Sequence, residues 1–135
     1  MKKILVSIIA IGWLGFVFSC EKTEEKVSEV MKKELFDLHD KLMPETMKVE
    51  DMKAKLDSMK TGADSANIEA IKNQLDQANA GMMDWMHNFD ISKLDSMAND
   101  QKIEYLKKQI DILKKVNEDT EASFKAYEDF TKNRS

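Results

Sequence analysis

The chain has 135 residues, of which 34% are charged and 42% hydrophobic, and its formal net charge is −4. This length corresponds to one small domain. The acidic balance argues against nucleic acid as a partner, since phosphates favour a clustered basic surface. A single cysteine excludes an internal disulfide.

The first segment has the features of a bacterial export signal. Lys2 and Lys3 precede an apolar stretch over 4–18, which is shorter than the roughly 20 apolar residues of a membrane-spanning helix. A basic start, a short apolar core and a small residue before the cleavage site are typical of secretory signals. The segment ends in Ser19-Cys20 and resembles the lipobox of bacterial lipoproteins. We therefore predict a signal peptide over 1–19 and a covalent lipid, palmitate included, on Cys20.

Two alternatives remain open: an uncleaved anchor, and an ordinary signal peptide followed by an unrelated cysteine. The lipoprotein interpretation is favoured because Cys20 is the only cysteine and directly follows the apolar core. It predicts an envelope protein, lipid-anchored to a membrane facing the periplasm or the cell surface, with no cofactor besides the lipid. Residues 20–26 then form the acylated cysteine and a charged tether. Glu21 to Glu25 are also similar to acidic surface-export tags, but a solvated tether is preferred.

The first periodic segment of the mature chain predicts a helix. Without residues 1–19, 19 basic and 25 acidic residues remain, a formal net charge of −6. Pro44 lies inside the segment and should bend the helix near Asp40; two helices broken at Met43 are the alternative. We prefer one kinked helix, because the apolar stripe resumes in phase. Gly62 is expected to end it in a left-handed conformation, and Asp64 is a candidate cap for the next helix. The stripe consists of Met31, Leu35, Leu38, Leu42, Val49, Met52, Leu56 and Met59.

Two further segments follow, separated by a predicted loop over 90–98. Both repeat apolar residues with the spacing of a helix, and neither alternates as a strand does. Short connections favour antiparallel neighbours. We therefore predict an all-α domain over 27–132, an up-down-up three-helix bundle or antiparallel coiled-coil hairpin with a long third helix. The second stripe is Ile68, Ile71, Leu75, Ala78, Met82, Trp85 and Phe89; the third is Ile103, Leu106, Ile110, Leu113, Val116, Thr120, Phe124, Tyr127 and Phe130.

Three short motifs resemble a group of small Bacteroidota lipoproteins that are often labelled "viral A-type inclusion protein". They are His39-Asp40-x-x-Met43-Pro44, Met82-Met83-Asp84-Trp85-Met86-x-x-Phe89 and Ile103-Glu104-Tyr105-Leu106. The resemblance covers most of the mature chain. It implies a periplasmic or surface lipoprotein, and it implies no activity.

One constellation suggests metal chemistry. If the first hairpin turns near residues 62–63, equal helical rise on both sides brings several soft ligands to one height beside Trp85. Imidazole and thioether groups suit Cu(I). Packing of the methionines in the core is the preferred interpretation, and haem ligation by either histidine is less favoured still. The candidate ligands are His39, Met43, Met82, Met86 and His87.

Enzyme signatures are not found. The sequence has no glycine-rich phosphate loop and no His-Glu-x-x-His pair, and Cys20 is used by the lipid. We therefore predict a non-catalytic helical module for structure or protein interaction, with an unknown protein partner or a second copy of itself. Exposed apolar residues at the end of the third helix, Tyr127 and Phe130, are the candidate interaction site.

Overall fold

The computed structural model of the protein describes residues 18–134, with side chains from Lys22 onward. Within this range the fold is all-α, as predicted, and contains no strand. The elements are α1 (Phe18–Thr46), α2 (Val49–Ser58), the 3₁₀ helix η1 (Gly62–Asp64), α3 (Ser65–Asn88), α4 (Ser92–Ser96) and α5 (Asn99–Lys132).

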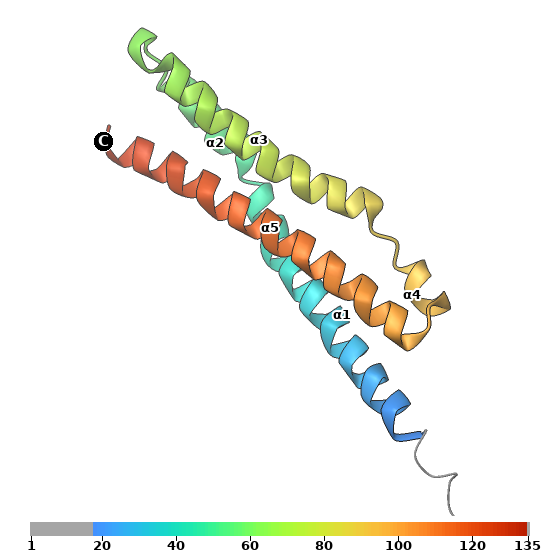
Figure 1. The fold of residues 1–135 in the computed structure, drawn as a ribbon. Helices are drawn as coiled ribbons and strands as arrows, with labels where there is room; N and C mark the ends of the chain where they lie inside the picture. Colours follow the sequence, from blue (N-terminus) through green and yellow to red (C-terminus); the bar gives the residue numbers. More distant parts are fainter. Residues whose placement is uncertain (1–17, 135) are drawn as a thin grey trace, which may run out of the picture.

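The helices run up, down and up. Figure 1 shows α1 and α2 following one another in one direction, α3 returning beside them, and α5 running back in the direction of α1. The 34-residue α5 has its main contacts with α1 and α3. The predicted bundle with a long last helix is therefore confirmed, with the first segment divided in two.

A heptad repeat explains why these helices pack along their whole length. The most deeply buried residues recur every seven positions, which keeps one face of each helix against its neighbours. They are Leu35, Leu42, Val49 and Leu56 on α1 and α2, Ile68, Leu75 and Met82 on α3, and Leu106 and Leu113 on α5.

The single kinked helix that we expected around Pro44 is wrong, because α1 ends at Thr46 and α2 begins at Val49. The alternative break at Met43 is placed too early. Pro44 lacks the N–H that would bind the carbonyl of Asp40, yet α1 continues past it. The Thr46 hydroxyl donates to the Met43 carbonyl at 2.9 Å, and a two-residue turn then redirects the chain.

The tether that we expected over 20–26 is part of α1 in the structure. None of the side chains at 22–27 is buried, and the first buried side chain of α1 is that of Ser28. The bundle therefore continues into the Cys20 region as a solvent-exposed helix. The predicted signal peptide lies outside the described residues over 1–17.

The turns also differ in detail from expectation. Gly62 does not end α2 in a left-handed conformation; it begins η1. Asp64 stands at the expected position before α3, but its carboxylate makes no capping hydrogen bond. The loop expected over 90–98 contains α4, whose Leu94 is buried in the core.

Three ion pairs cross the α2–α3 hairpin and fix its register. Their nitrogen–oxygen distances are short, at 2.7 Å for Lys53–Asp76, 2.7 Å for Lys72–Asp57 and 2.9 Å for Lys60–Glu69. The Lys72 ammonium donates a hydrogen bond that holds the pKa of Asp57 below its usual range. The pairs lie on solvent-facing sides of the helices, so they specify alignment more than they stabilise it.

Candidate functional site

Trp85 is the centre of the larger hydrophobic cluster and joins α3 to α1. The indole is only 5% exposed. It stacks on Phe89 with ring centroids 4.9 Å apart, and the His39 ring lies 5.6 Å away on α1. The indole Nε1 is buried and has no hydrogen-bond partner in the described part of the chain. An unpaired buried N–H is unfavourable by about 1–3 kcal/mol.

The soft ligands predicted from the hairpin register are partly brought together. Met82 is completely buried in the Trp85 cluster, and Met43 and Met86 pack against it from the side. His39 contacts Trp85 as described, and its Nδ1 lies 2.9 Å from the carboxylate of Asp40. His87, in contrast, is exposed to solvent. Among the described side chains, at 22–134, no group of three or more histidine, cysteine and carboxylate side chains is arranged to hold a metal ion.

The exposure that we expected of Phe130 at the end of the third helix is wrong, and an interaction through Tyr127 and Phe130 stays a prediction. Phe130 is only 7% exposed and belongs to a second cluster with residues of α2 and α3, and Tyr127 packs against the same cluster. The end of α5 therefore does not project past the hairpin. The reason is that the α2–α3 hairpin is long enough to reach Arg134, which covers the Phe130 ring at 4.3 Å.

Arg134 also fastens α5 to the turn before α3. Two guanidinium nitrogens contact the two carboxylate oxygens of Asp64, and Thr61 donates to the same carboxylate at 2.6 Å. The hydrogen bond from Arg134, with that from Thr61, lowers the pKa of Asp64 to about 2. Bidentate contact of this kind adds geometric specificity, so this clamp fixes how the distal end of the bundle closes.

A groove that the sequence reasoning did not find follows the seam between α3 and α5. Three hollows, of about 1010, 690 and 410 Å³, lie in a row and share lining residues. Lys115 and Asp119 line the first and second, while Gln74 and Asp129 line the second and third. The three hollows therefore adjoin one another along the seam, and we call them together the α3–α5 groove.

The groove walls carry a pattern that is visible in the sequence. On α3 seven of the lining positions recur at intervals of three and four, which is a second helical stripe; the other two, Ile71 and Trp85, belong to the buried stripe. This second stripe is polar or small, so a search for apolar periodicity passes over it. Its members are Asn67, Ala70, Gln74, Gln77, Gly81, Asp84 and Asn88.

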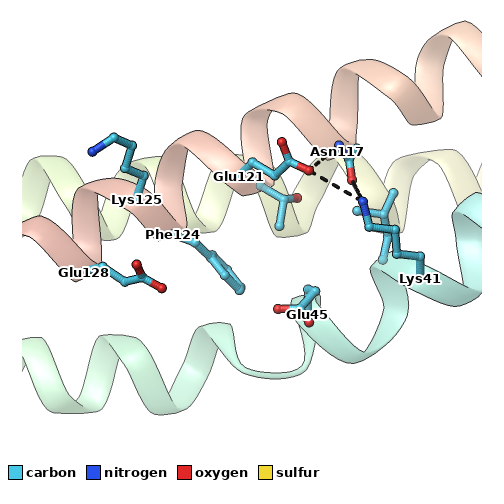
Figure 2. Close-up of a pocket in the computed structure, with 9 residues that line it drawn as sticks. Lys41, Glu45, Asn117, Glu121, Phe124, Lys125 and Glu128 are labelled. Carbon is cyan, nitrogen blue, oxygen red and sulfur yellow. Dashed lines mark hydrogen bonds and ion pairs between the residues drawn. The ribbon is translucent and has the colours of Figure 1, made fainter.

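A smaller pocket lies between α5 and the break between α1 and α2. It measures about 300 Å³. In Figure 2 the Phe124 ring extends from α5 towards the break, and Lys41 reaches from α1 to Asn117 and Glu121. The Lys41 ammonium donates to the Asn117 amide oxygen at 3.2 Å and lies 3.6 Å from a Glu121 oxygen. The polar rim is thus already occupied by its own contacts.

A comparison with known protein families, characterised proteins and solved structures found no match. Among the described residues, no helix combines the length and the apolar character needed to cross a membrane. The backbone of Cys20 lies in α1, and the structure does not describe its side chain. The candidate sites are therefore the Trp85 cluster and the α3–α5 groove.

Proposed function

We propose that this chain is an envelope-anchored lipoprotein whose helical bundle is a non-catalytic interaction module, and that it binds a helix of a partner protein along the α3–α5 groove. The α3–α5 groove is the observation that carries the interaction. The export signal and Cys20 support the anchor, which faces the periplasm or the cell surface.

The dimensions of the groove suit a helix. Its lining on α5 extends from Glu104 to Phe130, about 39 Å at the helical rise of 1.5 Å per residue. Gly81 lets α3 and α5 approach closely at the widest hollow, because a Cβ there would lie 3.3 Å from a methyl of Val116. The widest hollow has apolar lining from Trp85, Ile112 and Val116 among polar side chains, which suits the apolar face of an amphipathic helix.

Site-specific photocrosslinking in native cells tests the groove. A photoreactive residue at Ala122, which is exposed in the groove, should give a discrete adduct. The matched control is Ala54, which is equally exposed on α2. Ala70→Trp fills the groove from α3 without touching the core and should abolish the Ala122 adduct. Equal adducts at both positions, or adducts unaffected by Ala70→Trp, would contradict binding in the groove.

The anchor has its own test. Cys20→Ser should abolish labelling with radioactive palmitate and leave the unprocessed precursor in the membrane fraction. Normal cleavage and release of the Cys20→Ser protein would indicate an ordinary secretory signal.

Cu(I) binding is the second candidate, favoured by the convergence of His39 with methionines around Trp85. Imidazole and thioether ligands match the preference of Cu(I). Three methionine side chains already pack in an apolar cluster, so core packing explains their positions as well as metal binding does. The sulfur-bearing members are Met43, Met82 and Met86.

A further inference from the structure

We infer that the start of α1 is a rigid stalk, which holds the α4 end of the bundle against the headgroups of the membrane that carries the lipid. The inference rests on the acylation of Cys20 proposed above. It adds an orientation and a second contact surface to the anchor.

The start of α1 is a continuous helix without a flexible connection. The helix includes Cys20 and continues without interruption to Ser28, the first residue that the bundle buries. These positions are only about 12 Å apart along the helix axis. Figure 1 shows that α1 begins at the same end of the molecule as α4 and the start of α5. A lipid on Cys20 therefore places this end beside the bilayer.

Ion pairs are unevenly distributed between the two ends of the bundle. Away from the Cys20 end of the bundle, every lysine except Lys55 forms an ion pair with a carboxylate of a described residue. The remaining lysines without an ion pair to a described side chain lie at the start of α1, in α4 and in the first turns of α5. They are Lys22, Lys26, Lys32, Lys93, Lys102, Lys107 and Lys108.

These lysines match the chemistry of a phospholipid surface. Long cationic side chains extend towards phosphates while their methylene stems cover apolar surface, and anionic headgroups attract each lysine by about 1 kcal/mol. Val27 at 42% and Ile91 at 50% exposure add large apolar side chains to the same end.

Acidic side chains at this end limit the attraction between the lysines and anionic headgroups. Carboxylates without an ion pair to a described residue accompany the lysines and outnumber them, so the surface has no net positive charge. It contacts the headgroups only when the lipid holds it there. These acids are Glu24, Glu25, Glu29, Asp84, Asp90, Asp95, Asp100, Glu104 and Asp111.

The test uses the full lipidated protein in vesicles of phosphatidylethanolamine and phosphatidylglycerol. Because Cys20 is the only native cysteine, Val27→Cys supplies a unique thiol for a spin label once the lipid is attached. Ala63→Cys, exposed in η1 at the other end, is the matched control. Collision with a water-soluble nickel chelate should fall several-fold at position 27 on reconstitution and should not change at position 63.

The lysine contribution has a matched control as well. Lys22→Gln with Lys26→Gln should raise the accessibility of a label at position 27, whereas Lys55→Gln should not. Equal chelate accessibility at positions 27 and 63 in acylated protein would overturn the stalk alone. Protein without acyl mass on Cys20 would overturn the anchor and the stalk together. Protection at position 27 that persists in detergent would assign this surface to a second copy of the chain and overturn the membrane contact.

Discussion

Replacing Trp85 tests the packing on which both the fold and the candidate site depend. The indole is buried and stacks on Phe89, so Trp85→Ala removes a large apolar side chain and leaves a cavity. Changes of this kind lower the free energy of unfolding by about 3–5 kcal/mol. Trp85→Phe should be much milder, below about 1.5 kcal/mol, because it preserves an aromatic ring and removes an N–H that lacks a partner.

Urea unfolding followed by far-ultraviolet circular dichroism measures both losses. The control is Met83→Ala on the same helix, where the side chain is 56% exposed and the loss should stay within about 0.5 kcal/mol. An equally small loss for Trp85→Ala would refute burial of the indole. If Trp85→Phe proves as destabilising as Trp85→Ala, the indole N–H has a stabilising partner after all.

Three further predictions concern the Arg134–Asp64 clamp, the break between α1 and α2, and the binding of Cu(I). Above pH 3.8 the depressed pKa of Asp64 stabilises the fold, and this contribution is lost as the pH falls through about 2; melting of Asp64→Asn should therefore depend less on pH in this window. Pro44→Ala returns an N–H to the Asp40 carbonyl and should raise the unfolding free energy by about 1–3 kcal/mol; a loss would mean that the break needs proline. Cu(I) should leave Tm unchanged, whereas a rise that is absent from a triple variant would establish the second candidate. That variant carries leucine at Met43, Met82 and Met86.

The helices were predictable because burial follows a heptad repeat that needs no knowledge of partners. Leu35, Leu42, Val49 and Leu56 are seven residues apart, and the same spacing that predicted one helix also accommodates the break. The break itself was misplaced, because Pro44 indicates a lost hydrogen bond but does not specify which later residue ends the helix. In the structure, the hydrogen bond made by the Thr46 hydroxyl contributes to ending the helix there.

The sites were less predictable because they depend on contacts between distant residues. Phe130 looks exposed as long as the hairpin is assumed to be short, and the Arg134–Asp64 pair that closes the end joins residues 70 positions apart. Helical rise alone predicted that His39 and Trp85 lie at the same level of the bundle, and in the structure their ring centroids are 5.6 Å apart. The groove depends on a polar stripe that has no apolar signal, so only the packed helices reveal it.

The break between α1 and α2 also divides the core. Leu42 belongs to the cluster around Trp85, and Val49 belongs to the cluster around Phe130. The buried side chains between the two clusters are small or polar. The hydroxyl groups among them donate hydrogen bonds to backbone carbonyls of their own helices, as that of Thr120 does to the Val116 oxygen at 2.8 Å. Such residues bury little apolar area, so the two clusters are weakly joined at the level of the 300 Å³ pocket. The larger cluster, through Trp85 and Val116, also lines the widest hollow of the α3–α5 groove, while the Arg134–Asp64 clamp closes the end of the smaller cluster. We therefore expect the proposed partner, if it binds in the wide part of the groove, to stabilise mainly the cluster around Trp85. The buried residues of this junction are Thr46, Ala78, Thr120 and Ser123.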